Sequence, residues 1–263
     1  LHTNSALTGI TWASSISGTI SNLGIHTTGI TGNLDLSKFT SFITGASIAL
    51  YSNPSMTGIT WASSISGTFN GLHIYSTGIT GTLDLSKFSS FTSLGDIRLY
   101  SNPSMTGITW ASSITGTFAN IYIYSTGITG TLDLSKFTTF TATAQVYLNN
   151  NASVTGVNFP ASTISGFVRT LRLYSCTALG YVNLSTLRTG VNSLSWDLRN
   201  NGWTAAIVNQ VLVNTDSISA SGNTGRSIQI GGTNADPDTT SGGYDGTAAR
   251  TSLIGKGFVV TIT

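Results

Sequence analysis

Pairs of apolar residues, separated by one variable residue, recur along this chain every 24 or 25 residues. Each pair has the period-two alternation of a half-buried β-strand. The pairs are Leu23-x-Ile25, Ile48-x-Leu50, Leu72-x-Ile74, Ile97-x-Leu99, Ile121-x-Ile123, Val146-x-Leu148, Leu171-x-Leu173 and Trp196-x-Leu198. One short strand at a fixed period predicts a repeat solenoid with a parallel β-sheet along one side.

Two of these coils form a block of 49 residues that occurs three times almost unchanged. The sequence LDLSKF marks the block at Leu34–Phe39, Leu83–Phe88 and Leu132–Phe137. Helix formers are scarce between the strands, so we expect coils of strand and turn, with a second short strand on the flank. Leu1 falls on the last apolar position of a strand. We therefore expect the solenoid, residues 1–202, to be truncated within a coil at its N-terminus.

The pattern changes in the last part of the chain, residues 203–263. Thr204–Val213 has apolar residues at helical spacing, and Asp245–Gly255 predicts a second short helix that ends at glycine. Arg226–Ile230 and Phe258–Ile262 are predicted strands. Together with the strand before it, this βαβαβ segment is predicted to cap the open end of the apolar stack.

The residues that follow each strand resemble the leucine-rich repeat, L-x-x-L-x-L-x-x-N/C-x-L. An example is LYSNPSMTGI at Leu50–Ile59. The Asn/Cys position of that pattern is filled by Asn4, Asn53, Asn102, Asn151, Cys176 and Asn201, whereas Thr28, Thr77 and Thr126 replace it in the alternate coils. A polar residue there is expected to satisfy backbone groups at the turn that leaves the strand. We interpret Cys176 as a buried structural residue.

The tail carries a narrower resemblance. Trp196–Asn201 followed by Thr204–Leu212 is similar to the C-terminal part of phage or Bacteroidetes-type surface leucine-rich-repeat proteins. The resemblance implies a sheet on the concave face of the solenoid and an extracellular location, on a virion or a bacterial cell surface.

The charge of the chain is low and nearly balanced, with 8% charged residues, a formal net charge of +2 and no glutamate. Such a chain has no field to attract nucleic acid or an anionic membrane, so neither is an expected partner. It also has no run of eighteen apolar residues, so we expect no membrane insertion. Serine, threonine and glycine supply most of the polar exterior.

Two rows of outward residues are the strongest candidate for a binding site. One row follows the second apolar position of each strand, and the other lies between the two apolar positions. Strand parity places both rows on the same outward face. The candidate ligand-binding residues are His26, Tyr51, His73, Tyr75, Arg98, Tyr100, Tyr122, Tyr124, Tyr147, Arg172 and Tyr174.

Two interpretations of the rows stay open. Tyrosines one strand spacing apart, about 4.8 Å, can simply stack on each other and cover the sheet. Stacking does not require Arg98, Arg172 and His73 in the second row, however. Aromatic rings beside hydrogen-bond donors suit a sugar ring, which has an apolar face and a polar periphery, and they are also typical of protein hot spots.

Other features predict less. Asp35, Asp84 and Asp133 lie too far apart to share a proton or a metal ion, and we expect weak surface pairs with Lys38, Lys87 and Lys136.

The repeated Trp12, Trp61 and Trp110 are expected to pack in the core or at its rim. The loop Gly231–Gly246 contains Asp236, Asp238 and Asp245 but lacks calcium-loop spacing, so calcium binding there stays open.

No nucleophile, base and orienting residue can be assembled, and the sequence predicts neither a catalytic residue nor a metal site or cofactor. We therefore expect a non-enzymatic recognition module that binds a cell-surface receptor or glycan through the Tyr/Arg/His face, in a phage tail or an adhesin. The alternative is a structural segment of a fibre, or of a filament that self-associates. The sequence does not identify the ligand.

Overall fold

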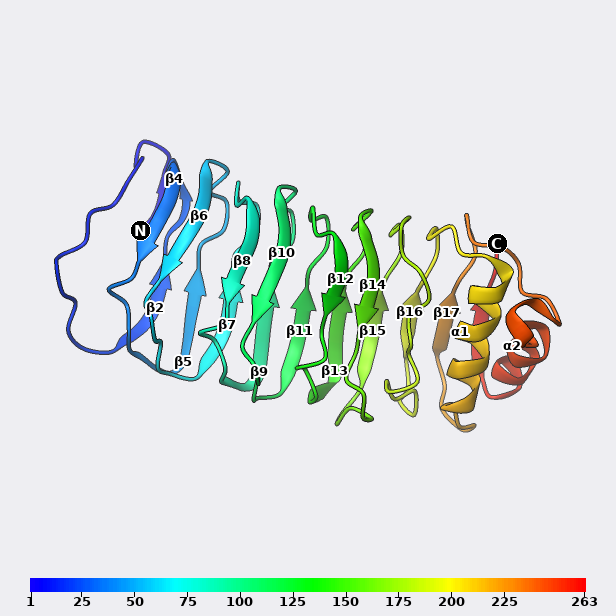
Figure 1. Ribbon diagram of the computed structural model, residues 1–263. Coiled ribbons are helices and arrows are strands. Elements are labelled where there is room, and N and C mark those ends of the chain that lie inside the picture. The colour runs from blue at the N-terminus through cyan, green and yellow to red at the C-terminus, as the bar shows by residue number, and fades with distance from the viewer. The chain divides into compact units, whose positions relative to one another are not determined.

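The computed structural model describes residues 1–263 and divides into two compact units, residues 1–128 and 129–263. Each unit is a parallel β-solenoid in which strands of successive coils pair side by side, and the few helices all lie in the second unit (Figure 1). The predicted parallel solenoid is therefore confirmed. The two units are described separately below.

The first unit contains one strand of the main sheet per coil. These strands pair in chain order: β2 (Ile20–Gly24), β5 (Phe42–Ala49), β7 (Phe69–His73), β9 (Phe91–Arg98) and β11 (Phe118–Tyr122). The register aligns the apolar pairs, so that Leu23, Ile48, Leu72, Ile97 and Ile121 are neighbours, and all five are buried. This apolar ladder is the core of the unit.

Shorter strands complete the coils of the first unit. At the end of the chain nearest Leu1, β1 (His2–Asn4) pairs with β3 (His26–Thr28). On the flank, β4 (Gly32–Leu36) pairs with β6 (Met56–Trp61), and β8 (Gly81–Leu85) pairs with β10 (Met105–Trp110). The second short strand that the sequence predicts on the flank is thus present.

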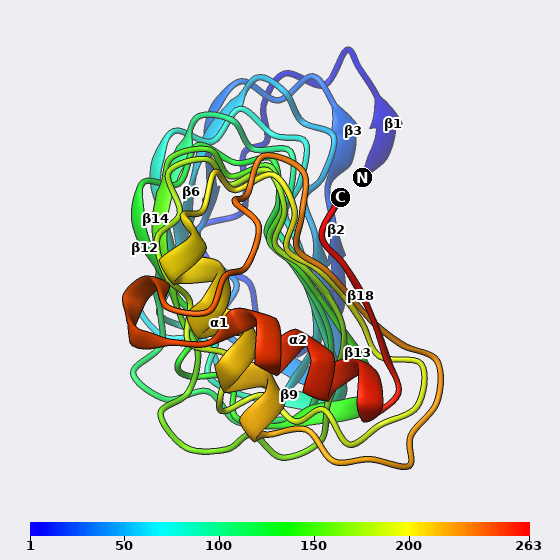
Figure 2. The same cartoon turned by 90° about the vertical axis from the view of Figure 1, so that its right-hand side faces the viewer.

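In the second unit, the sheet consists of β13 (Phe140–Tyr147), β15 (Val168–Arg172), β16 (Ser195–Asp197), β17 (Arg226–Gln229) and β18 (Phe258–Thr261), while β12 (Gly130–Asp133) and β14 (Val154–Asn158) pair on the flank. The helices are α1 (Ala205–Ser217), the short 3₁₀ helix η1 (Ser241–Gly243) and α2 (Gly246–Gly255). The strand and helix segments predicted for the tail are present, and α1 continues beyond Val213. Helix α2 packs against α1 and β18 (Figure 2).

Buried asparagines hold the coils together where the chain leaves the sheet. The Asn53 side chain accepts hydrogen bonds from the N–H (2.9 Å) and hydroxyl (2.8 Å) of Thr28, and it donates to the carbonyls of Ile25 (2.7 Å) and Leu50 (3.0 Å). Asn102 makes the same four contacts one block later. The threonine that departs from the leucine-rich pattern is therefore the partner of the asparagine in the next coil.

The opposite junction, from an asparagine coil to the following threonine coil, depends on glycine. A Cβ atom on Gly78 would lie 2.3 Å from the carbonyl oxygen of Pro54, which is far closer than real contacts allow. Gly127 meets the carbonyl of Pro103 at 2.2 Å in the same way. Glycine after each threonine thus lets two backbones approach.

The Asn/Cys ladder continues in the second unit. Asn201 accepts the N–H of Cys176 (2.8 Å), and Asn234 accepts that of Asn201 (2.9 Å). The sequence analysis did not include Asn234 in the ladder. Cys176 is fully buried, its thiol donates to the carbonyl of Leu148 (3.3 Å), and burial raises its pKa to about 11. These contacts fit a structural cysteine.

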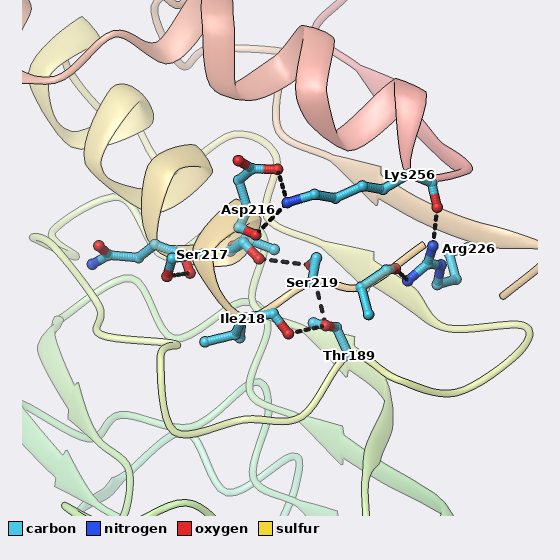
Figure 3. A network of polar contacts seen from close by, with 10 residues as sticks. Thr189, Asp216, Ser217, Ile218, Ser219, Arg226 and Lys256 are labelled. Atoms are coloured by element: carbon cyan, nitrogen blue, oxygen red, sulfur yellow. Dashed lines mark hydrogen bonds and ion pairs between the residues drawn. The ribbon is translucent and has the colours of Figure 1, made fainter. Parts of the chain in front are cut away.

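A polar network joins α1, α2 and the strand between them (Figure 3). The ammonium of Lys256 donates to the carboxylate and the carbonyl of Asp216, both at 2.8 Å. The guanidinium of Arg226 is fully buried, donates to the carbonyls of Ala220 and Lys256, and lies 4.1 Å from the ring centre of Phe258. Burial lowers the pKa of Arg226.

Replacing Asn102 with alanine is expected to destabilise the fold by roughly 3 kcal/mol, because the N–H of Thr77 and two carbonyls lose their buried partner. Urea unfolding followed by circular dichroism measures the loss. Asn70→Ala is the matched control, since Asn70 is exposed and its recorded side-chain contact is with the hydroxyl of Thr92. Equal destabilisation by the two substitutions would contradict a structural role for the ladder.

Candidate functional site

The first candidate row, which we call the stacked row, consists of the ring residues that follow the sheet strands of the first unit. Its members are His2, His26, Tyr51, Tyr75, Tyr100 and Tyr124. The residue after each ring has a positive φ of 54° to 57°, as Ser52, Ser76 and Ser101 do. The N–H of each of these serines donates to the carbonyl of the next tyrosine in the row, at 3.0–3.1 Å. The backbone therefore fixes the register of the rings.

The rings of the stacked row lie face to face. Centroid separations along the row are 5.3, 4.3, 4.6, 4.3 and 4.6 Å, and the interplanar angles do not exceed 16°. Tyr51 and Tyr75 are parallel within 1°, and Tyr100 and Tyr124 within 2°. Burial, followed by the neighbouring hydroxyls of Tyr75 and Tyr124, raises the pKa of Tyr100. The Tyr100 hydroxyl therefore stays protonated at neutral pH.

This geometry confirms the stacking of tyrosines that the strand spacing predicts, and it limits how the rings can meet a sugar. Rings at these separations cover one another's faces, so an interior member such as Tyr75 presents its edge and its hydroxyl, not its face, to a ligand. A sugar ring cannot stack on the face of such a tyrosine. The tyrosines are nonetheless half-buried rather than fully covered, so their outer parts remain accessible.

A polar cluster lies in the second candidate row of the first unit. Arg98 at the end of β9 donates to the Asp96 carboxylate through Nε (3.0 and 3.1 Å) and pairs with it through Nη2 (2.7 Å). His73 at the end of β7 brings Nε2 within 3.3 Å of the same carboxylate. The guanidinium also lies 5.7 Å from the ring centre of Tyr122. His73, Asp96 and Arg98 thus form one compact group on neighbouring strands.

Asp96 was not among the residues predicted from sequence. It precedes the inward Ile97 and so has the same outward parity as Arg98, two residues later. Its equivalents in the neighbouring coils are Gly71 and Asn120, so the carboxylate is not repeated and a search for repeated residues does not find it. A search for an opposite charge two residues from Arg98 on the same strand face would have found it.

The second unit brings its candidate residues together differently. The guanidinium of Arg172 lies 4.3 Å from the ring centre of Tyr147, so these two predicted residues are paired. The residue that follows Tyr174 in its row is Arg199, which is not aromatic. Arg199 donates hydrogen bonds to the Asp197 carboxylate at 2.8 and 2.9 Å. Asn149, which parity places in the outward row, is buried. Within the second unit, the outward row therefore does not form a stack of tyrosines.

The repeated aspartates form no close ion pair with the lysines three residues later, although the charges of Lys38 and Lys87 help to lower the pKa of Asp35 and Asp84. The carboxylates of Asp35, Asp84 and Asp133 each accept the backbone N–H of the serine two residues later, at 2.8–2.9 Å. For Asp84, burial alone would raise the pKa, but the hydrogen bonds from Ser86 outweigh it and lower the pKa. These carboxylates stabilise the turns after the flank strands.

The repeated tryptophans pack at the rim of the core. Trp12 and Trp61 meet the buried Phe39 and Phe88 edge-on, with ring centres 4.7 and 4.9 Å apart. Each tryptophan remains partly exposed. This agrees with the expectation from sequence that they pack in the core or at its rim.

The loop Gly231–Gly246 uses two of its three aspartates internally. Asp238 accepts hydrogen bonds from the hydroxyl and the N–H (2.7 Å) of Ser241, from the side chain of Asn209 (2.8 Å) and from the N–H of Thr240 (3.0 Å), which together lower its pKa. Asp245 caps α2 by accepting the N–H of Ala248 (2.8 Å). The structure gathers no group of three His, Cys, Asp or Glu side chains that suits a metal ion. None of its helices combines the length and apolar character needed to cross a membrane.

Comparisons with protein-family models, with curated proteins and with solved structures give no match.

The polar cluster predicts a pH dependence of stability. Burial alone would raise the pKa of Asp96, but its contacts with His73 and Arg98 lower it below the unfolded value of about 3.9. The folded state therefore binds fewer protons than the unfolded chain near pH 4, and the stabilisation is lost as the pH falls through the folded pKa. Asp96→Asn is expected to cost about 1 kcal/mol at neutral pH.

The difference in unfolding free energy between wild type and Asp96→Asn should narrow as the pH falls below about 4, because the wild-type carboxylate is then protonated. Urea unfolding over a series of pH values measures it. Asp236→Asn, at an exposed aspartate, is the charge-matched control. A constant difference at every pH would contradict the assigned role of Asp96.

Proposed function

We propose that this chain is a non-enzymatic recognition module, which binds a receptor or glycan through the face formed by the stacked row and the polar cluster. We also propose that its coils are of the leucine-rich-repeat type, with this sheet on the concave side, and that residues 203–263 form a cap. The four-contact Asn53 at the Asn/Cys position supports the first of these structural proposals. Helices α1 and α2 in the tail support the second.

The stacked row is the observation that carries the proposal. Its rings are held in place before any ligand arrives, by the backbone register and by contacts with their neighbours on either side. Ordered side chains lose little conformational entropy when they bind, so each contact contributes more to affinity. Tyrosine and arginine are also the residues that most often dominate binding energy at surfaces.

The state of Asp96 supports a role without catalysis. Asp96 is the carboxylate of the polar cluster, and its pKa is lowered by His73 and Arg98. A general acid or base works best with a pKa near the operating pH. A carboxylate held as an anion by an arginine is suited to fixing the position of that arginine.

The exterior supports a place on a virion or bacterial surface, in a tail fibre or an adhesin. Charged residues make up 8% of the chain, and hydroxyl and amide groups provide most of the remaining polarity. Such a surface has weak long-range electrostatics, so encounters with charged molecules are not favoured.

Replacing Tyr75, Tyr100 and Tyr124 together with serine should reduce binding to a receptor-bearing cell or an immobilised glycan array by about 100-fold or more, because three hot-spot residues are lost. Binding of the fluorescent protein to the array and to bacterial cells measures the effect. The control is Thr57→Ala with Thr106→Ala, two exposed hydroxyls outside the rows. Unchanged binding by the folded serine variant would refute the proposal.

A structural role in a fibre or self-associating filament is the second candidate, and the edge strand β18 favours it. Strand β18 (Phe258–Thr261) is the outermost strand of the sheet in the second unit. It contains no charged residue, and its Val259 is 65% exposed. Charge is a common guard against pairing between edge strands.

If edge strands pair, sedimentation velocity should show species heavier than the monomer, because β18 of one copy pairs with an edge strand of another copy. The fraction of these species should increase with protein concentration. Val259→Lys should abolish these species by placing a charge on the edge. A monomer throughout the concentration series would rule out the structural candidate.

A further inference from the structure

The tyrosines of the stacked row offer a regular series of polar edges instead of aromatic platforms. Tyr51, Tyr75, Tyr100 and Tyr124 are separated by 4.6, 4.3 and 4.6 Å, with nearly parallel planes. The neighbours cover both faces of Tyr75 and Tyr100. What a ligand meets is one phenol group per coil. The hydroxyls of Tyr75 and Tyr100 also interact with each other, and each phenol oxygen retains capacity to accept a hydrogen bond from a ligand.

From this geometry we infer that the ligand is an uncharged, extended polysaccharide, which lies along the stacked row and binds the tyrosine hydroxyls and ring edges at about one sugar per coil. The inference rests on the proposed function and names the class of ligand. The stacked row and an extended polysaccharide are both linear and regularly repeating, and the row repeats with the strand spacing of about 4.8 Å. Hydroxyl groups occur on every sugar of such a chain, so each phenol can meet a hydroxyl of the sugar nearest to it.

The charges of the face favour an uncharged polymer. The row itself contains tyrosine and histidine, and the cation beside it, Arg98, is already paired with Asp96 at 2.7 Å. An acidic polysaccharide would need unpaired cations along its length. The row also fits a protein partner poorly, because protein interfaces bury apolar surface at their centre and the ring faces here are covered.

The polar cluster interrupts an otherwise repetitive surface. The positions of His73 and Arg98 on the strands are taken by Gly24 and Ala49 in the preceding block. A uniform series of phenols binds a polymer but permits it to slide by one coil. The guanidinium of Arg98, held by Asp96 and close to Tyr122, supplies one distinct position, so we assign it the selection among sugars.

The decisive variant replaces Tyr75, Tyr100 and Tyr124 with phenylalanine. It keeps the rings and their stacking and removes only the hydroxyls. The probes are neutral β-1,4-linked glucose and mannose oligomers from dimer to hexamer, with oligogalacturonate of equal length as the acidic comparison. Calorimetric titration of the wild type should show affinity that rises with the length of the neutral oligomers and weaker binding of the acidic ones.

The phenylalanine variant is expected to lose about 30-fold or more in affinity for the neutral hexamer, because three hydrogen bonds are removed. If phenylalanine preserves the affinity while the serine variant loses it, recognition by hydroxyls is overturned and the proposed binding face stands. If neither variant loses affinity, both proposals fail. Affinity independent of length, preference for the acidic oligomers, or no binding of any neutral oligomer would also overturn the inference.

A second variant, His73→Gly with Arg98→Ala, gives β7 and β9 the residues found at the equivalent positions of the preceding block. It should keep the dependence on chain length and reduce the difference in affinity between the glucose and mannose series at least about threefold. An unchanged preference between the two series would overturn the selective role of the cluster.

Discussion

The buried carboxamide is the interaction on which the rest of this fold depends. Each coil must turn away from the sheet, and the turn leaves backbone N–H and carbonyl groups inside the protein. Asn53 and Asn102 satisfy those groups in their own coil and in the coil before. Unsatisfied, they would each cost about 1–3 kcal/mol. Because the turn is fixed, the residue at its start also has a fixed position. In the first unit that residue carries a ring of the stacked row, as Tyr51 and Tyr100 do.

Much of the fold follows from the sequence because its period is strict. The apolar pairs predict the sheet strands and their register, and the Asn/Cys positions predict the buried ladder. The loss of period after Trp203 indicates the helices of the tail. Asn234 is harder to find because the coil that contains it is longer: 33 residues separate it from Asn201. The flank strands depend on alternation too short to define their ends.

The site is less predictable than the fold, and the reason is physical. Parity tells which side chains share a face, so Tyr75 and Arg98 are found correctly as neighbours of one surface. Parity does not tell whether rings meet face to face, since this depends on side-chain rotamers and on the spacing of coils. It also does not reveal pairing within a strand, as between Asp96 and Arg98. The chemistry of the face, hydroxyl edges beside a neutralised cation, appears only when these contacts are known.

The two kinds of junction between coils limit how such a chain can gain or lose coils during evolution. A threonine coil joins the next coil through a carboxamide, whereas an asparagine coil joins the next through the close approach at Gly78. Removing one asparagine coil of the repeated region would bring two threonine coils together, and the N–H and hydroxyl of the first threonine would lose the carboxamide that they bind. Duplication or deletion of a whole block of two coils would keep both kinds of junction. Each added block would lengthen the tyrosine series by two rings, so the length of the proposed binding face would change in discrete steps.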